Sequence, residues 1–491
     1  MSKIEKYSHI NEFLRCIIKS RNVDKERTEM KKIWATVFAG VLMCGCMSAA
    51  GCGKNENDNT IVYYMWGSAQ EVETARQLAS DFEVMYPEWH IEVQPSSGNY
   101  YDSLKTYFGG GNAPDLFFME GGMIENFIKD GLILNLDPYI ENSETFTKED
   151  LWEVNDYYRY DPETNRMGSG GLYAVVKDLT PDFMMIYNKE HIDDYNEEHE
   201  VSMAEEVGYP TDENGIYPSE SVAMTWEQCT KLCRLLTEFD SNGNITRYGT
   251  TLDQVPWKHV MEWIQMGGDT LFTEGMGNLN IHSQAVIDAF EYFIDFQSGD
   301  TQSAAPVASG SVGGGEGFKN GDISVVWNGR WAWQSYGWYD VDFEIGVAPP
   351  PTPEGGTDIY CATTMISHAI SSASEHPEIA WAFLEYYMTA GMRTYVQTGY
   401  NIPGNKTIAY GDFLNVSDPY QKKLNEYFMS FLEKASPLTY SFYIDQSRVE
   451  SILGDYIPRV WAADAKDRLT LTEALEQAAD EIDTVIAGGG S

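Results

Sequence analysis

Hydrophobic residues recur with strand and helix periods along the chain from residue 60 onward. Residues 61–65 form a short apolar run, and apolar side chains then recur every three or four positions from 72 to 85. The second spacing is typical of an amphipathic helix. Further β-type runs follow at 90–94 and 116–119. The order strand, helix, strand predicts a parallel sheet with helices packed against it, and therefore an α/β fold.

Later runs extend this pattern and indicate where the chain passes between domains. β-type runs occur at 173–176, 183–187 and 323–327, and the polar segment 177–182 separates the first two. The proline-rich segment 349–353 can form neither a helix nor a central strand, so we expect it to cross between domains. A length of 491 residues allows two or three domains, each with its own core.

Aromatic and acidic side chains follow several of the predicted strands. Trp66, Glu120 and Trp331 each come just after one. Ligands of α/β proteins bind beyond the carboxyl ends of strands, and a flat indole face suits a sugar ring better than it suits charge chemistry. Burial in the core is the alternative for Trp327, Trp331 and Trp333, and the sequence does not decide it for any one of them.

The charge balance narrows the classes of partner. The chain has 33 Lys and Arg residues against 75 Asp and Glu residues, a formal charge of -42. A polyanion is repelled by nucleic acid and by anionic membrane surfaces, so we expect neither as a direct partner. So many acids also produce carboxylate pairs by chance, which makes such a pair weak evidence for catalysis.

A targeting signal begins at Met30. Two lysines follow that residue, then an apolar stretch over 33–43 and small residues ending in Gly51 and Cys52. This ending resembles the lipobox of bacterial lipoproteins, in which the cysteine is lipidated and becomes the new N-terminus. The resemblance predicts a signal peptide at 30–51.

Alternatives remain for this segment. Residues 1–29 are polar and lack a core pattern, so we expect them to be a non-native extension, with Met1 as the alternative start. Residues 52–59 read as a tether that follows the lipidated Cys52. Cleavage before Cys46, a plain signal peptide and an uncleaved anchor are the other possibilities.

The sequence contains no pattern typical of a metal or cofactor site. Cys229 and Cys233 are four residues apart in a predicted helix and are interpreted as small apolar residues on one face. No histidine or further cysteine lies near them with zinc spacing. Residues 240–244 resemble a calcium loop only faintly, so a tight turn is favoured, with structural calcium left open. We expect no metal and no cofactor.

Several segments resemble one known family, in the same order along the chain. They resemble the extracellular solute-binding proteins of bacterial ABC importers, in the sugar-binding group that includes maltose-binding protein. The most specific is Asn-Gly-Arg-Trp-Ala-Trp at 328–333. The resembling segments are 82–87, 114–115, 131–136, 186–189, 225–226, 318–333, 377–384 and 470–482.

The resemblance implies a fold with two α/β lobes, of the type II periplasmic-binding-protein kind. Each lobe is a sheet flanked by helices, and the ligand lies in the cleft between the lobes. The first lobe would comprise 58–180 and 353–405, and the second 181–352 and 406–491.

The same resemblance implies a binding protein and no enzyme. It implies a lipoprotein on the outer face of the cell membrane, attached by its lipid anchor only. There it would capture a carbohydrate, an oligosaccharide by preference, and deliver it to the permease subunits of an ABC transporter. We expect it to act as a monomer.

Family contact positions carry over one at a time. Trp331 matches a tryptophan that stacks on sugar, Trp66 matches a strand-end position in the cleft, and Glu120 falls within a residue of a hydroxyl-binding position. Pro181 departs from the family pattern, where a glutamate is usual, so the adjacent Asp182 is the replacement candidate. The candidate ligand-binding residues are Trp66, Glu120, Asp182, Trp257, Trp327, Trp331, Tyr440 and Tyr443.

A secreted glycoside hydrolase is the alternative function. Such an enzyme would also carry aromatic residues and paired acids. However, the sequence fixes no acid pair at a defined spacing, and it contains no Gly-x-Ser-x-Gly, His-Glu-x-x-His or Walker motif. No catalytic residue can be named.

Overall fold

The larger of the two main β-sheets is mixed and has the strand order β15-β7-β14-β3-β1-β2, with β16 also pairing with β14. Strands β2 and β3 lie parallel to β1, as the strand–helix–strand pattern predicted, whereas β14 runs antiparallel to β3 and β7. Its strands are β1 (Thr60–Met65), β2 (His90–Pro95), β3 (Leu116–Met119), β7 (Val175–Asp182), β14 (Cys361–Ile370), β15 (Ile402–Pro403) and β16 (Ala435–Pro437).

This architecture comes from a computed structural model. It describes residues 59–491 except for 165, 253–255, 274–276, 299–303, 306–313, 355–360, 439–440, 442, 445, 463, 465 and 489–491. Thr60–Ser491 forms one compact unit. No helix among the described residues is long and apolar enough to cross a membrane.

Helix α3 (Ala69–Met85) shows how the local sequence produces this sheet. Ser68 caps the helix by accepting a hydrogen bond from the Glu71 amide, and the Glu71 carboxylate in turn accepts one from the Ser68 amide. This reciprocal cap satisfies two amide groups that have no partner inside the helix. Apolar residues between 72 and 82 face inward and pack on the sheet, as their spacing predicted.

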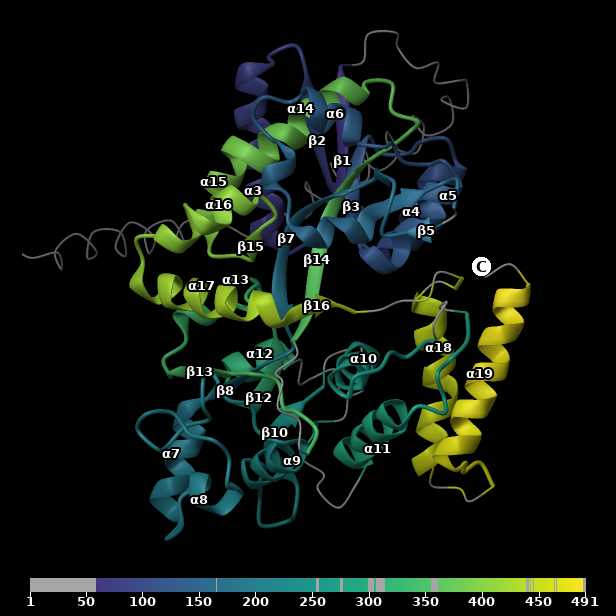
Figure 1. Cartoon of the computed structure of the whole chain (residues 1–491). Helices are drawn as coiled ribbons and strands as arrows, with labels where there is room; N and C mark the ends of the chain where they lie inside the picture. Colours follow the sequence, from purple (N-terminus) through teal and green to yellow (C-terminus); the bar gives the residue numbers. More distant parts are fainter. Residues whose placement is uncertain are drawn as a thin grey trace, which may run out of the picture. The chain divides into compact units, whose positions relative to one another are not determined.

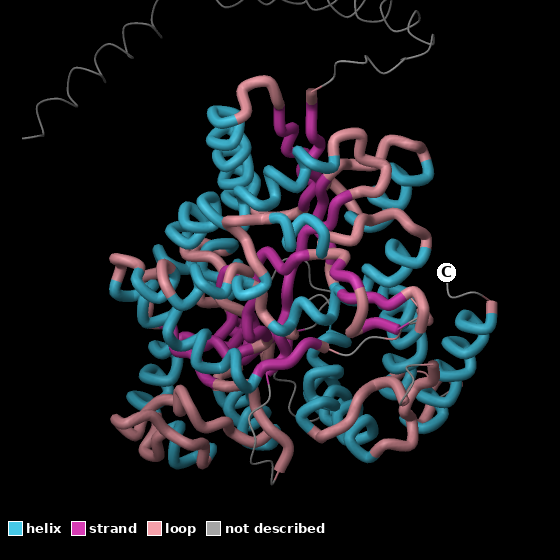
Figure 2. Tube along the Cα trace, turned by 45° about the horizontal axis from the view of Figure 1, so that its top comes forward, coloured by secondary structure: helices cyan, strands magenta, loops and turns pink. Residues whose placement is uncertain are grey.

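A second mixed sheet carries the other core, with the order β11-β10-β12-β8-β13 and with β9 paired to β10. Helices surround the strands of both sheets (Figure 2). The strands are β8 (Met184–Asn188), β9 (Glu238–Phe239), β10 (Ile245–Thr251), β11 (Ala304–Ala305), β12 (Ile323–Asn328) and β13 (Ile345–Ala348). Helices α10 (Pro256–Met266) and α11 (Gln284–Ser298) pack together, as do α18 (Gln446–Tyr456) and α19 (Leu471–Ala487) (Figure 1).

The remaining elements are short or lie on the flanks of the sheets. The helices are α4 (Tyr100–Gly109), α5 (Ile124–Lys129), α6 (Asp137–Asn142), α7 (Lys189–Glu198), α8 (Met203–Val207), α9 (Trp226–Leu235), α12 (Gly314–Lys319), α13 (Ala332–Ser335), α14 (Pro377–Tyr386), α15 (Met392–Tyr395), α16 (Lys406–Tyr410) and α17 (Pro419–Phe431). A small sheet has the order β5-β4-β6, formed by Arg166–Met167, Arg159–Asp161 and Gly171–Leu172.

Strand β7 corrects one prediction. Residues 177–182 were expected to break the chain between two strands, yet every residue of β7 is a buried strand residue. The break lies one residue later, at Phe183, whose φ of 53° separates β7 from β8. The polar residues of this segment led to the wrong prediction because Lys177 and Asp178 form an ion pair of 2.7 Å inside the sheet. Each charge is thus compensated where it is buried.

Two connections link the sheets. Strand β7 of the larger sheet continues through Phe183 into β8, and the segment 349–360 leads from β13 into β14. The proline-rich segment thus lies between strands of different sheets. Helix α17 packs with the core of the larger sheet, and β16 pairs with β14. The proposed lobe boundaries remain predictions. The boundary at 405/406 assigns α17 and β16 to the second lobe, although both pack with the larger sheet.

We predict that Lys177→Met lowers the free energy of unfolding by about 3–5 kcal/mol, because it leaves the Asp178 carboxylate buried and unpaired. Urea unfolding followed by circular dichroism measures this loss. The double variant Lys177→Met with Asp178→Asn should regain part of it. Lys148→Met, which breaks an exposed ion pair with Glu141, is the control and should leave the unfolding midpoint unchanged. Equal midpoints for Lys177→Met and the control would refute the account of β7.

Candidate functional site

A cavity of about 490 Å³ lies where strands β1, β3 and β7 end and the segment after β12 begins. Its wall combines indole and phenol rings with carboxylates drawn from distant parts of the chain. The lining residues are Trp66, Gly67, Ser68, Glu71, Glu120, Asp178, Asp182, Phe183, Lys258, Trp331, Ser335, Tyr336, Thr364, Met365, Ile366, Tyr400 and Asn401.

Trp66 is held at this wall by other rings. Its indole lies edge-on to Tyr100, with ring centroids 4.5 Å apart, and edge-on to Phe118 at 5.0 Å. Edge-to-face contacts of this kind are favourable for aromatic pairs. Trp66 is partly buried, so one part of the ring is fixed by packing and the rest faces the cavity.

A tight turn after β12 brings Trp331 to the same cavity. The turn requires glycine at 329, because a Cβ atom there would lie 2.6 Å from Thr180 Cγ2 and 2.9 Å from Asp182 Oδ1. The next amide, that of Arg330, donates to Thr180 Oγ1 at 3.1 Å. The close approach to β7 therefore sets the place of the Trp331 ring, whose Nε1 lies 3.5 Å from Asp182 Oδ2.

Asp182 is a buried carboxylate at the end of β7. Its Oδ2 accepts a hydrogen bond from the Thr364 hydroxyl at 2.6 Å, and its Oδ1 accepts one from the Phe183 amide at 3.0 Å. Each carboxylate oxygen has two lone-pair directions. Asp182 is thus held in one orientation at the cavity wall.

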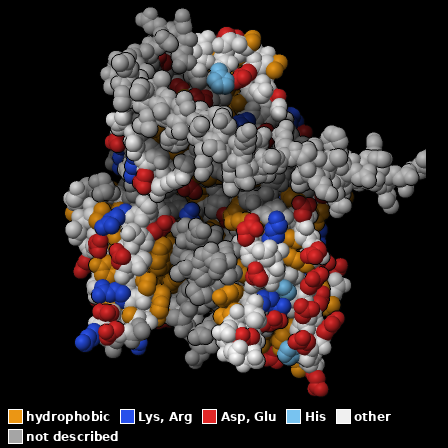
Figure 3. Space-filling view, turned by 180° about the vertical axis from the view of Figure 1, so that it is seen from behind, with side chains coloured by type: hydrophobic (Ala, Val, Ile, Leu, Met, Phe, Trp, Pro, Cys, Tyr) orange, Lys and Arg blue, Asp and Glu red, His pale blue; other side chains and the backbone are white. Residues whose placement is uncertain are grey.

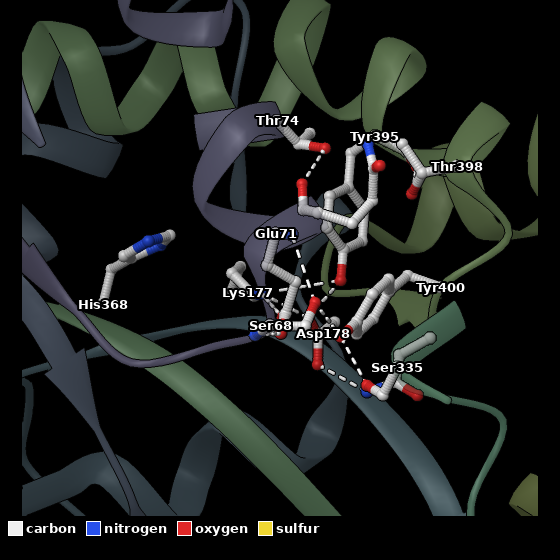
Figure 4. Close-up of polar contacts among 12 residues, drawn as sticks. Ser68, Glu71, Thr74, Lys177, Asp178, Ser335, His368, Tyr395, Thr398 and Tyr400 are labelled. Carbon is white, nitrogen blue, oxygen red and sulfur yellow. Dashed lines mark hydrogen bonds and ion pairs between the residues drawn. The ribbon is translucent and has the colours of Figure 1, made fainter. Parts of the chain in front are cut away.

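Another part of the wall is a network of hydroxyls and charges around Tyr400 (Figure 4). The Tyr400 hydroxyl lies 2.7 Å from Ser335 Oγ and 3.3 Å from Ser68 Oγ. Burial, together with the nearby Glu71 charge, raises the pKa of Tyr400, so this phenol stays neutral and can both donate and accept hydrogen bonds. Asp178 accepts from Asn401 at 3.0 Å within the same wall.

Two smaller cavities adjoin the first. The second cavity, of about 210 Å³, shares Glu120, Lys258, Thr364 and Met365 with the first and has a largely apolar wall. The third cavity, of about 240 Å³, also includes Glu120 and Lys258 in its wall. The second cavity is lined by Glu120, Gly121, Gly122, Glu125, Asp156, Tyr157, Met167, Gly168, Lys258, Thr363, Thr364, Met365, Pro437, Leu438 and Ser441.

The structure brings together four of the predicted site residues: Trp66, Glu120, Asp182 and Trp331 all line the first cavity. Trp66, Glu120 and Trp331 were predicted from their common place after strands, whereas Asp182 was predicted from its place beside Pro181, where the family pattern has a glutamate. Lys258 and Tyr400 were missed because nothing in their local sequence marks them as neighbours of β3 or α3.

The other predicted residues lie elsewhere. Trp257 and Trp327 are buried in the second core, and the Trp327 indole donates to Thr250 Oγ1 at 3.1 Å. These two rings fill the core, so we leave them out of the proposed site. Tyr443 is exposed and lines none of the three cavities, whereas Tyr440 and Cys52 fall outside the described residues.

A buried carboxyl lies beside the Asp182 end of the cavity. Burial raises the pKa of Glu262 well above its usual value, and the Asp182 charge adds to this, while the hydrogen bond from the Ala362 amide opposes it. Burial, helped by the Lys258 charge, also lowers the pKa of His259 to about 3, so this histidine is neutral at pH 7.

The described residues give no strong indication of metal or redox chemistry. No group of three or more His, Cys, Asp or Glu among them is arranged to hold a metal ion. Cys229, Cys233 and Cys361 are buried free thiols, and burial raises the pKa of Cys233 and Cys361. Asp240 accepts from the Asn242 and Asn244 amides, both at 2.8 Å, which makes a tight turn.

Comparison with known proteins now identifies the family. The sequence profile of the bacterial extracellular solute-binding proteins matches residues 66–394, which include most of the cavity wall. The chain belongs to this family. The family is one of binding proteins for solutes.

Solved structures of solute-binding proteins share the fold. An ABC substrate-binding protein from Listeria monocytogenes in complex with cycloalternan is 18% identical with a TM-score of 0.69, over 87% of this chain and 99% of that one. A solute-binding protein from Thermotoga lettingae bound with α-D-tagatose is 17% identical with a TM-score of 0.68, over 87% and 100%. The maltose/maltodextrin-binding domain from Bdellovibrio bacteriovorus bound to maltotriose is 16% identical with a TM-score of 0.66, over 87% and 100%.

These likenesses confirm the expected fold class. The chain has the two-lobed α/β fold of type II periplasmic binding proteins, with a helix-flanked sheet in each lobe. At this level of identity the likeness concerns the fold, and the ligand has to be argued from the cavity itself.

The raised pKa of Glu262 predicts a pH-dependent stability. Because the folded protein holds this proton more tightly than the unfolded chain does, the stabilisation is complete below the pKa of the unfolded chain and is lost as pH rises through the folded-state pKa. Glu262→Gln should therefore gain stability relative to the wild type between pH 5 and pH 8, by at most roughly 1.4 kcal/mol per pH unit. Urea unfolding at several pH values measures the difference. Glu476→Gln, on the exposed face of α19, is the control, and a parallel pH profile for Glu262→Gln and wild type would contradict the prediction.

Proposed function

We propose that this chain binds a carbohydrate in the first cavity and releases it unchanged. The observation that carries the proposal is the meeting of Trp66 and Trp331, from distant parts of the sequence, at one wall with the carboxylates of Glu120 and Asp182. Had the two rings faced different surfaces, the proposal would have failed.

The chemistry of this wall matches a polyhydroxylated ring. Indole faces cover the apolar CH surface of a sugar, whereas a carboxylate accepts hydrogen bonds from two neighbouring hydroxyls. The hydroxyls of Tyr400, Ser68 and Ser335 act as both donors and acceptors, which suits sugar hydroxyls again.

The adjoining cavity supports an oligosaccharide. The first and second cavities share Glu120 and Lys258, so a ligand with more than one ring would extend from the first into the second. Tyr157 and Met167 offer apolar surface to a second ring there. The solved relatives with cycloalternan and maltotriose support this choice of ligand class.

The cellular role that we propose is that of a lipid-anchored binding protein on the outer face of the membrane. Lipidation of Cys52 would hold the protein at the membrane. The permease subunits of an ABC transporter would recognise the monomeric, ligand-loaded protein. The intact mass of protein purified from cell membranes tests the anchor: we expect a chain that begins at lipidated Cys52, and a chain that retains residues 30–51 would refute it.

The decisive experiment incubates the purified protein with fluorescently labelled oligosaccharides chosen from a thermal-shift screen. We expect saturable binding, recovery of the labelled sugar at its original length, and a smaller radius of gyration by X-ray scattering in the bound state. Shortened products would instead establish a glycoside hydrolase, and no binding to any neutral sugar would reject the carbohydrate proposal.

We predict that Trp331→Ala and Trp66→Ala each weaken binding of that oligosaccharide by about 1–3 kcal/mol, in line with the loss of one ring stack. Isothermal titration calorimetry measures the change. Trp89→Ala is the matched control, because Trp89 is a partly buried tryptophan that packs on His376 and lines none of the three cavities. Equal losses in all three variants would mean that the effect is on stability and not on the site.

A further inference from the structure

An ion pair spans the groove where the three cavities meet. Lys258 Nζ lies 3.8 Å from Glu120 Oε1, and both residues line all three cavities. Glu120 directly follows β3 of the larger sheet, whereas Lys258 is on α10, which packs in the second core. The pair therefore joins the two halves of the molecule across the proposed ligand groove.

The groove around this pair is otherwise acidic. Lys258 is the one Lys or Arg side chain among the described residues that line the first and second cavities. The carboxylates that line those two cavities are Glu71, Glu120, Glu125, Asp156, Asp178 and Asp182. Some are already compensated, as Asp178 is by Lys177 and Glu125 by Lys129.

The charge of the whole molecule makes this cation more consequential. Acidic side chains are spread widely over the surface seen from behind, with fewer basic ones among them (Figure 3). With a formal charge of -42, two acidic halves that approach each other repel. Part-buried charges are screened less by salt than exposed ones, and Lys258 keeps only 26% of its side chain exposed.

The same charges act on a further carboxyl in the groove. Glu450, on α18, lines the third cavity together with Lys258. Burial raises the pKa of Glu450, the Lys258 charge opposes that rise, and the Glu120 charge adds to it. Lys258 thus acts on the carboxylate that follows β3 and on the carboxyl of α18 at once.

We propose that Lys258 is a positioning residue that holds the two walls of the groove together by offsetting the repulsion between their carboxylates. Without it, Glu120, which follows β3 of the larger sheet, would face Glu450 on α18 across the groove, and Lys105 would be the remaining lysine among the described residues that line the third cavity. The closed arrangement, and with it the joint contact of both walls with a ligand, would then be favoured less. This role concerns the protein before any ligand is bound, so it does not depend on the identity of the sugar.

X-ray scattering of the ligand-free protein at low salt tests the proposal. Lys258→Met should increase the radius of gyration, and Lys258→Arg should restore the wild-type value because the charge is retained. Half-molar NaCl should shrink the difference between Lys258→Met and wild type, since screening weakens the repulsion. Lys148→Met removes a positive charge from an exposed ion pair elsewhere and should leave the radius unchanged.

A second measurement uses the binding assay and rests on the proposed carbohydrate function. Lys258→Met should weaken oligosaccharide binding about two- to fivefold at low salt, the range expected for one solvent-accessible ion pair, and less at high salt. An unchanged radius at low salt overturns the proposal, as does an increase that neither arginine nor salt reverses, because that result would indicate lost packing. Failure of the wild type to bind any sugar would reject the proposed function and leave the scattering result standing.

Discussion

The buried ion pair in β7 is the constraint on which the site depends. Burial alone would lower the pKa of Lys177, but the nearby Asp178, Tyr387 and Glu71 together outweigh that effect and the net shift is upward. Lys177 therefore stays charged inside the sheet, 2.7 Å from Asp178 and 3.7 Å from Glu71. Asp178 in turn accepts hydrogen bonds from Tyr395 at 2.7 Å and Asn401 at 3.0 Å. One compensated charge thus orders a strand, the start of a helix and the loop that forms a cavity wall.

Much of the fold could be predicted because it follows from local rules. The period of apolar residues and the Ser68 cap defined α3, and continuous apolar runs defined β1 and β3. Strand β7 could not be recognised in the same way, since Glu71, Tyr395 and Asn401, which help to satisfy its charges, become neighbours of Lys177 and Asp178 only in the folded chain. Single-sequence patterns therefore fail where polar groups are buried in pairs.

The site was predictable to the same extent. Trp66 and Trp331 were found because strand ends converge in α/β sheets, whatever the sequence distance between them. Trp327 was also predicted, but a residue inside a strand points to one face or the other, and here it points into the core. Lys258 lies on a helix that carries no motif, so its contact with Glu120 is a product of how the two halves pack.

The buried thiols have a consequence for following the molecule in solution. Cys361 begins β14, next to the Ala362 amide that donates to Glu262 on α10 at 2.9 Å. It is fully covered, and its raised pKa leaves it protonated and poorly nucleophilic in the native state. An alkylating reagent can reach the Cys361 thiol only when the start of β14 separates locally from the residues packed around it. The rate at which Cys361 is alkylated therefore reports how often the structure opens locally at the junction of its two sheets.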